Sequence, residues 1–162
     1  MQTYADIQLL ILIAVANTAP LVAKIIAGSR FSQPIDNGTV MRDGQPLLGS
    51  SKTIRGATCS IAATMILAPL VGLDVGIGLS IGAAAMAGDL LSSFLKRRLR
   101  LSPSSKATGL DQIPESLLPT LAMWQTLSLT IVDVIAIVAV FFIGEILMSK
   151  LMFRFHLRDR PY

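Results

Sequence analysis

Residues 75–98 read VGIGLSIGAAAMAGDLLSSFLKRR, and this stretch decides how the chain folds. Its first part, Val75 to Leu91, is almost entirely apolar and reaches the length that a helix needs to cross the roughly 30 Å hydrocarbon core of a bilayer. It is also dense in glycine and alanine, small residues that let neighbouring membrane helices approach closely. We therefore predict a membrane-spanning helix at the centre of a helical bundle.

The composition of the whole chain agrees with this prediction. Of its 162 residues, 52% are hydrophobic and 15% are charged, and the mean hydropathy is +0.65, which is too apolar for a soluble domain of this size. The formal charge of +4 does not indicate nucleic acid, because Lys and Arg in membrane-protein loops set the orientation and bind anionic lipid or phosphate groups. We expect the lipid bilayer as the surroundings and no nucleic acid as partner. The single cysteine, Cys59, excludes an intramolecular disulfide.

Four further apolar segments accompany the central helix. We predict spans at about 7–26, 57–73, 75–91, 113–129 and 131–153. The second and third are joined by little more than Asp74 and should form a tight hairpin. The apolar run from Ile113 to Phe153 is too long for one span, and it breaks at Ser128 to Thr130, where Thr130 can cap the last helix and Asp133 suits its first turn. The expected fold class is a single all-α integral membrane domain, residues 1–162, with five transmembrane helices.

The distribution of basic residues tests the number of spans. With five spans and the amino terminus outside, all 14 Lys and Arg lie at or within the cytoplasmic side, as the positive-inside rule requires. Four spans would move Lys150, Arg154, Arg158 and Arg160 to the opposite side. We therefore predict a multi-pass plasma-membrane protein with its carboxy terminus and two polar loops, about 27–56 and 96–112, in the cytoplasm.

The first polar loop ends in cations and a hydroxyl at the amino-terminal mouth of the second helix: Lys52, Thr53 and Arg55. A helix amino terminus offers free N–H groups and the positive end of its dipole, so cations beside it make an anion site, for which phosphate is the natural ligand. The glycine spacing of a P-loop is absent. The alternative is that Lys52 and Arg55 only anchor the helix at the membrane interface.

The second polar loop places charged residues on the end of the central helix. Asp89, Ser93, Lys96 and Arg97 are separated by three or four residues and so share roughly one helix face. A carboxylate inside the end of a membrane span is costly and calls for a partner or a metal, which makes Asp89 a functional candidate. Asp111 stands at the entrance of the fourth helix, where the alternative is that it merely caps that helix.

Two carboxylates and several cations at one membrane surface suit a metal-assisted phosphoryl-type transfer. Mg²⁺ takes one or two carboxylate oxygens together with the phosphates of the substrate, and Lys and Arg neutralise the charge that builds up in the transition state. The one histidine, His156, follows the last span and is remote in sequence from both loops, so we do not assign it as a base.

At these residues the sequence resembles the CDP-archaeol synthase family, within the CDP-diglyceride synthetase-like cytidylyltransferases. The resemblance runs through almost the whole chain. Its motifs are Ala16 to Pro20, Pro34 to Gly38, Asp43-Gly44, Lys52-Thr53-x-Arg55-Gly56, Gly88-Asp89-Leu90, Ser93-Phe94-x-Lys96-Arg97 and Leu110-Asp111-Gln112. The longer bacterial diacylglycerol enzymes resemble this chain only around Gly88 to Arg97 and Asp111.

The resemblance implies transfer of a cytidylyl group from CTP to a membrane lipid phosphate in phospholipid biosynthesis, with Mg²⁺ as cofactor and pyrophosphate as product. The lipid is phosphatidic acid or its archaeal ether counterpart. By resemblance, Asp89, Asp111 and Lys96 are catalytic, and Asp89 and Asp111 hold the metal. The residues implied in substrate binding are Asn17, Lys52, Thr53, Arg55, Ser93, Arg97 and Gln112.

Two other classes of function remain as alternatives. The first is a non-enzymatic membrane subunit whose basic loops bind anionic lipid headgroups, which would leave Asp89 without a purpose. The second is a transporter that uses Asp89 and Glu145 for ion coupling, although the sequence has neither inverted repeats nor paired broken helices.

Overall fold

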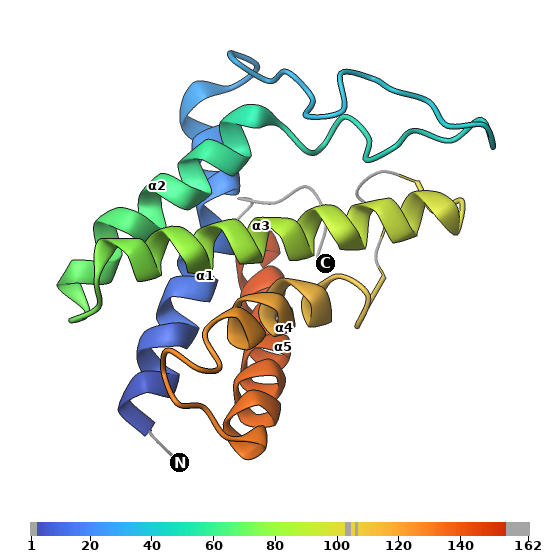
Figure 1. The fold of residues 1–162 in the computed structure, drawn as a ribbon. Coiled ribbons are helices and arrows are strands. Elements are labelled where there is room, and N and C mark those ends of the chain that lie inside the picture. The colour runs from blue at the N-terminus through green and yellow to red at the C-terminus, as the bar shows by residue number, and fades with distance from the viewer. Residues whose placement is uncertain (1–2, 103–104, 106, 155–162) are drawn as a thin grey trace.

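The computed structural model describes residues 3–102, 105 and 107–154, and these residues are helical with connecting loops (Figure 1). The elements are α1 (Thr3–Ala27), α2 (Ile54–Leu70), α3 (Val75–Arg98), α4 (Gln112–Ala122) and α5 (Ile131–Arg154). The predicted all-α class is confirmed. Among the described residues, α1, α3 and most of α5 are long and apolar enough to cross a membrane. His156, Arg158 and Arg160 lie outside them.

Helix α3 packs along α2 on one side and α4 on the other, and α1 contacts all four other helices (Figure 1). The hairpin of α2 and α3 turns at Asp74, whose side chain accepts a hydrogen bond from the N–H of Gly76 and so caps α3. A Cβ at Gly78 would lie 2.5 Å from the Thr64 carbonyl oxygen, and one at Gly82 would lie 2.3 Å from the Thr64 hydroxyl. These glycines therefore allow the close approach that the small-residue pattern predicts.

The apolar core fills the half of the bundle nearest Asp74. Its buried side chains are Leu9, Leu12, Ile13, Ala68, Ile81, Met123, Leu129, Ile137 and Phe141. They come from the first halves of α1, α3 and α5, the end of α2 and the segment that follows α4. The opposite end of α3 carries buried polar side chains instead, including Ser93, Lys96 and Arg97. The apolar cluster thus lies in one half of the bundle, and the candidate site lies in the other.

Helix α4 is the element that departs most from the prediction. It ends at Ala122 rather than near residue 129, and turns occupy residues 123–128, with Ser128 at a positive φ of 51°. Its 11 residues rise about 16 Å, about half the hydrocarbon core of a bilayer. Helix α2 begins at Ile54, three residues earlier than predicted, because Thr53 caps it, and it also ends three residues earlier, at Leu70. The five-span topology stays a prediction.

The predicted start of α5 is confirmed in detail. Asp133 Oδ2 accepts hydrogen bonds from the backbone N–H of Thr130, at 2.9 Å, and from its hydroxyl, at 2.7 Å. The Asp133 N–H donates in return to the Thr130 hydroxyl. This reciprocal arrangement satisfies N–H groups that a helix start otherwise leaves unpaired.

Candidate functional site

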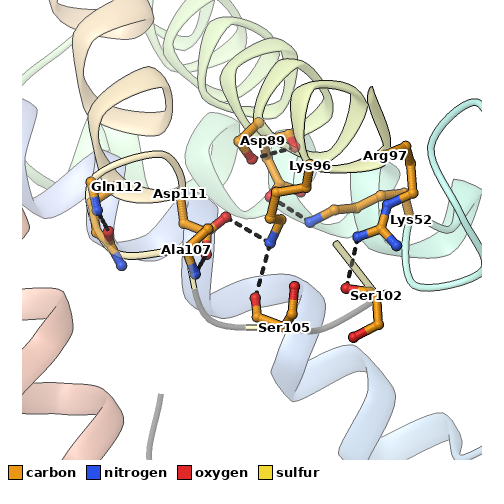
Figure 2. A network of polar contacts seen from close by, with 11 residues as sticks. Lys52, Asp89, Lys96, Arg97, Ser102, Ser105, Ala107, Asp111 and Gln112 are labelled. Atoms are coloured by element: carbon orange, nitrogen blue, oxygen red, sulfur yellow. Dashed lines mark hydrogen bonds and ion pairs between the residues drawn. The ribbon is translucent and has the colours of Figure 1, made fainter. Parts of the chain in front are cut away.

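The candidate site lies where the second half of α3 meets the loop before α2 and the chain that leads into α4 (Figure 2). Asp89, Lys96 and Arg97 come from α3, Lys52 from the loop, and Asp111 from the start of α4. The structure thus brings together side chains from both predicted polar loops.

Lys52 and Asp89 form the first ion pair of the site. The Lys52 Nζ lies 2.5 Å from Asp89 Oδ1, and both side chains are at least four-fifths buried. Burial opposes the charge of the ammonium, but the nearby carboxylates of Asp89 and Glu115 outweigh it, so the pKa of Lys52 lies above its usual value. Lys52 is therefore a held cation inside the protein and not a free interfacial anchor.

Lys96 and Asp111 form the second ion pair. The Lys96 Nζ lies 2.6 Å from Asp111 Oδ1 and 3.5 Å from the carbonyl oxygen of Ser105. Asp111 is the N-cap residue of α4, but its side chain makes no capping hydrogen bond within the described chain. Its second oxygen faces the connector instead, 3.4 Å from the N–H of Ala107.

Arg97 is the most deeply buried cation of the site, with 2% of its surface exposed. Its Nη2 donates to the Ser102 carbonyl oxygen at 2.9 Å, while its Nε has no partner among the described residues. A buried guanidinium with an unused donor can accept an anion at little additional desolvation cost. Ser93, also buried, lies on the same helix one turn before Arg97.

Several residues implied in substrate binding make local contacts. The Thr53 hydroxyl accepts from the Gly56 N–H at 3.1 Å and caps α2. Arg55 donates to the carbonyl oxygens of Gly28 and Arg30 and thereby ties the end of α1 to the start of α2. The Asn17 amide donates to the Ile13 carbonyl oxygen of its own helix. Gln112 accepts from the Gly109 N–H at 2.8 Å. Their substrate contacts stay a prediction.

Sequence reasoning missed Glu115. This residue is 7% exposed, and its backbone nitrogen would lie 2.8 Å from a Cβ added at Gly88, the residue before Asp89. The signal was present, since Glu115 follows Asp111 by four residues and therefore falls on the same side of the α4 start. The sequence places Glu115 at the start of the fourth helix without indicating a functional role for it.

The loop that carries Lys52 is fixed by a buried carboxylate. Asp36 Oδ2 accepts from the N–H groups of Leu48 and Gly49, each at 2.9 Å, and Oδ1 accepts from that of Gly38 at 3.1 Å. Burial alone would raise the pKa of Asp36, but these amide hydrogen bonds outweigh it and hold the pKa below its usual value. Asp36 therefore orders both ends of the loop.

Arg98 fastens the same loop to the end of α3. Its guanidinium pairs with Asp43, donates to the Pro46 carbonyl oxygen at 2.6 Å, and lies 5.3 Å from the ring centre of Phe94. A backbone hydrogen bond from Gln45, together with the hydrogen bond and charge of Arg98, lowers the pKa of Asp43. The loop and α3 are thus joined at two places, Lys52 with Asp89 and Arg98 with Asp43.

The carboxylates offer a donor set for a hard divalent cation. Within the described part of the chain no three Asp, Glu, His or Cys side chains stand together as a complete metal cage. Mg²⁺ does not need one, because it usually binds through one or two carboxylates and completes its shell with water and substrate phosphates. Asp89 and Asp111, each paired with a lysine of the site, are the carboxylates that fit this mode of binding.

The chain is similar to known membrane enzymes of archaea. A family model described as CarS-like, CDP-archaeol synthase, matches residues 71–162. The CDP-archaeol synthase of Sulfurisphaera tokodaii is 33% identical over 80% of this chain and 81% of its own length. That of Aeropyrum pernix is 38% identical over 61% of this chain and 57% of its own, and that of Pyrococcus furiosus is 35% identical over 60% of each chain. The matches to the latter two thus span less than two thirds of those relatives.

A solved structure of an intramembrane enzyme for archaeal membrane lipids biosynthesis superposes on the fold. Its TM-score is 0.71 at 27% identity, and the match covers 86% of this chain and 91% of the other. The apolar helices and this likeness define a multi-pass, all-helical membrane protein. The chain belongs to the CDP-archaeol synthase family.

Proposed function

We propose that this protein transfers a cytidylyl group from CTP to a membrane lipid phosphate, with Mg²⁺ as cofactor, and so makes a CDP-activated lipid such as CDP-archaeol and pyrophosphate. The observation that carries the proposal is the pair of buried salt bridges, Lys52 with Asp89 and Lys96 with Asp111, in a member of this family. Cations and carboxylates alternate there at one end of a membrane bundle, as binding of a metal-bound triphosphate requires.

The cations of the site would bind the phosphates of CTP. Each lysine ammonium now lies against a carboxylate and has hydrogen atoms left for a second acceptor. Arg97 has its unused Nε. When a triphosphate enters, Lys52, Lys96 and Arg97 neutralise the negative charge that accumulates on the phosphate oxygens as the reaction proceeds.

The lipid phosphate needs little help as a nucleophile, because it is already ionised at neutral pH. One of its oxygens attacks the α-phosphorus of CTP in line, forming a new P–O bond as the bond to the β-phosphate oxygen breaks. Pyrophosphate leaves with the electron pair of the broken bond. The protein contributes orientation and charge neutralisation, and no side chain has to remove a proton.

Asp89 and Asp111 would hold the Mg²⁺, which supplies positive charge to the triphosphate when bound. The two residues belong to α3 and to the start of α4. In each, the Oδ1 atom already binds a lysine ammonium, so these carboxylates can bind a positively charged group. Each lysine contacts one oxygen of its carboxylate, so the other oxygen of that carboxylate can still bind a metal.

The proposed topology has five spans, with the amino terminus outside and the site in the cytoplasm, in the plasma membrane. In support, Lys96, Arg97 and Arg98 lie in the last turn of α3, at the end of the helix opposite Asp74, and Lys52 pairs with Asp89 in the second half of the same helix. The positive-inside rule expects basic residues on the cytoplasmic face, where CTP is available, so this gathering supports the proposed orientation.

The direct test is a reaction of the purified protein with radiolabelled CTP, Mg²⁺ and a panel of lipid phosphates with ether-linked or ester-linked chains. We expect a labelled CDP-lipid and an equal amount of pyrophosphate with at least one of them. Binding of anionic vesicles without any CTP consumption would instead support the non-enzymatic lipid-binding alternative.

A further inference from the structure

A groove lies between the second half of α1 and the first half of α2. Its volume is about 440 Å³, within the range of about 300–1,000 Å³ that ligand pockets have in proteins. The hydroxyl of Thr18, which lines it, donates to the Ala14 carbonyl oxygen of its own helix at 2.8 Å. The groove therefore suits a hydrocarbon chain. Its lining side chains are small or apolar: Val15, Thr18, Ala19, Val22, Ala23, Ile26, Cys59 and Ala63.

The contact between α1 and α2 separates this groove from the candidate site. The Ser60 hydroxyl donates to the Ala16 carbonyl oxygen at 2.7 Å, which marks the line where the two helices touch. On one side of that line, Thr64 packs closely against Gly82 of α3. A helix turns by about 100° per residue, so Cys59 lies on the other side of the line from Thr64. The groove thus faces away from α3, the helix that carries the candidate site.

The end of the groove nearest the loop before α2 carries positive charge. Ile26 lines the groove at this end. Arg55 donates from its Nη1 to the carbonyl oxygens of Gly28 and Arg30, which follow Ile26 by two and four residues. Arg55 also precedes Cys59 by four residues, so both lie on one face of α2. The Arg55 Nε has no partner among the described residues, and an anion at the end of the groove would satisfy it.

An exposed aromatic side chain indicates that this end lies at the level of the lipid headgroups. Phe31 directly follows Arg30, and 82% of its surface is exposed. Aromatic side chains are enriched at the boundary between membrane and water, where the headgroups lie. The groove is therefore apolar along its length and cationic at its headgroup end, which matches a molecule with a hydrocarbon chain and a negative headgroup.

From these observations we infer that the groove binds one anionic phospholipid of the surrounding bilayer, with a chain between α1 and α2 and its phosphate at Arg55. The bound lipid strengthens the junction that Arg55 makes between the end of α1 and the start of α2. Lys52 of the candidate site stands only three residues before Arg55, so the lipid supports its position from outside the site. Such a lipid carries a phosphodiester and is not a substrate of the proposed reaction, so its binding does not depend on CMP transfer.

The test measures the lipids that the purified protein retains in native mass spectrometry, with EDTA present and without CTP. The probes are phosphatidylglycerol, which is anionic, and phosphatidylcholine, which is zwitterionic, with the same acyl chains. We expect the wild type to bind one phosphatidylglycerol per chain about fivefold or more tightly than phosphatidylcholine, because a nearby cation favours the negative headgroup.

Two neighbouring alanines of α2 supply the variant and its matched control. Ala63→Phe fills the groove, whereas Ala62→Phe adds the same side chain at an exposed position outside it. We expect Ala63→Phe to bind phosphatidylglycerol about tenfold or more weakly, because the chain loses its apolar contacts, and Ala62→Phe to bind it as the wild type does. Arg55→Gln should lose the preference for phosphatidylglycerol over phosphatidylcholine.

Wild-type affinity for phosphatidylglycerol in Ala63→Phe would overturn the inference, and so would equal retention of the two lipids by the wild type. A dimer that retains no lipid and that Ala63→Phe dissociates would overturn it as well, because the groove would then hold a second copy of the chain. If Ala63→Phe does not fold, Ala23→Phe on the opposite wall of the groove replaces it, with the same expected loss of binding and the same contrary results.

Discussion

Lys52 and Asp89 are 37 residues apart in sequence, yet their side chains meet at 2.5 Å between the loop before α2 and the second half of α3. The pair joins the two polar segments of the chain into one site. It also gives Lys52 a purpose that its position at a helix start does not reveal, since a held ammonium beside a carboxylate can pass from that carboxylate to a phosphate.

Replacement of Lys52 should therefore affect the reaction more than the fold. Lys52→Met retains the length of the side chain but removes its charge, and we expect kcat/KM for CMP transfer to fall by about a hundredfold to a thousandfold. Lys24→Met, at the exposed end of α1, is the control and should retain activity. Steady-state kinetics on both variants check this, and near wild-type kinetics for Lys52→Met would remove Lys52 from the site.

The close contact of α3 and α4 predicts opposite effects of alanine at two glycines. Gly88→Ala must push α4 away from α3, and we expect a loss of about 1–3 kcal/mol of stability. Gly144→Ala adds a Cβ that meets no described atom within 4 Å, and should stabilise α5 by about 0.5–1 kcal/mol. Thermal unfolding of the two variants in the same detergent measures the difference. Equal melting temperatures would contradict the contact.

The hydrogen bonds of Asp36 predict how the order of the loop depends on pH. Its pKa is lower in the folded protein than the ordinary value of 3.8, so the folded state binds fewer protons. The contribution of Asp36 is then fully present above about pH 5 and is lost as the pH falls through the lowered folded value. Hydrogen exchange at Leu48 and Gly49 should be faster in Asp36→Asn than in the wild type at pH 7, and the difference should vanish in strong acid.

The five-span topology predicts that both ends of the described chain lie on opposite sides of the membrane. A reporter placed after Arg154 should be cytoplasmic, and one placed before Thr3 should be outside. Reporter activity in whole cells and in permeabilised cells distinguishes the two sides. A carboxy-terminal reporter found outside would contradict the prediction that α4 and α5 each cross the membrane once.

The sequence predicted those parts of the fold and site that depend on local spacing. Ser93, Lys96 and Arg97 follow Asp89 along one helix, so periodicity alone groups them. The cap of α5 by Thr130 and Asp133 is equally local, and hydropathy identified the long helices. These features can be predicted without knowing which other helices or loops pack against them.

The parts that the sequence did not predict depend on contacts between distant segments or on the nearest backbone group. Glu115 was missed because its burial depends on the packing of the first turn of α4 against Gly88 of α3. Thr53, Arg55 and Asn17 were assigned to substrate binding by resemblance; the structure shows their hydrogen bonds to backbone groups, which the sequence did not indicate, and their substrate contacts stay a prediction. The early end of α4 was missed because the apolar segment continues through turns that hydropathy does not distinguish from helix.

The central claim is that the two salt bridges mark the centre of a metal-dependent cytidylyltransferase. The most direct measurement is Mg²⁺-dependent formation of CDP-lipid from CTP by the wild type, Asp89→Asn and Asp111→Asn, each purified from membranes in folded form. We predict product with the wild type and at least a hundredfold less with each variant. Full activity in either variant, or no CDP-lipid from the wild type with any ether-linked or ester-linked lipid phosphate, would contradict the account.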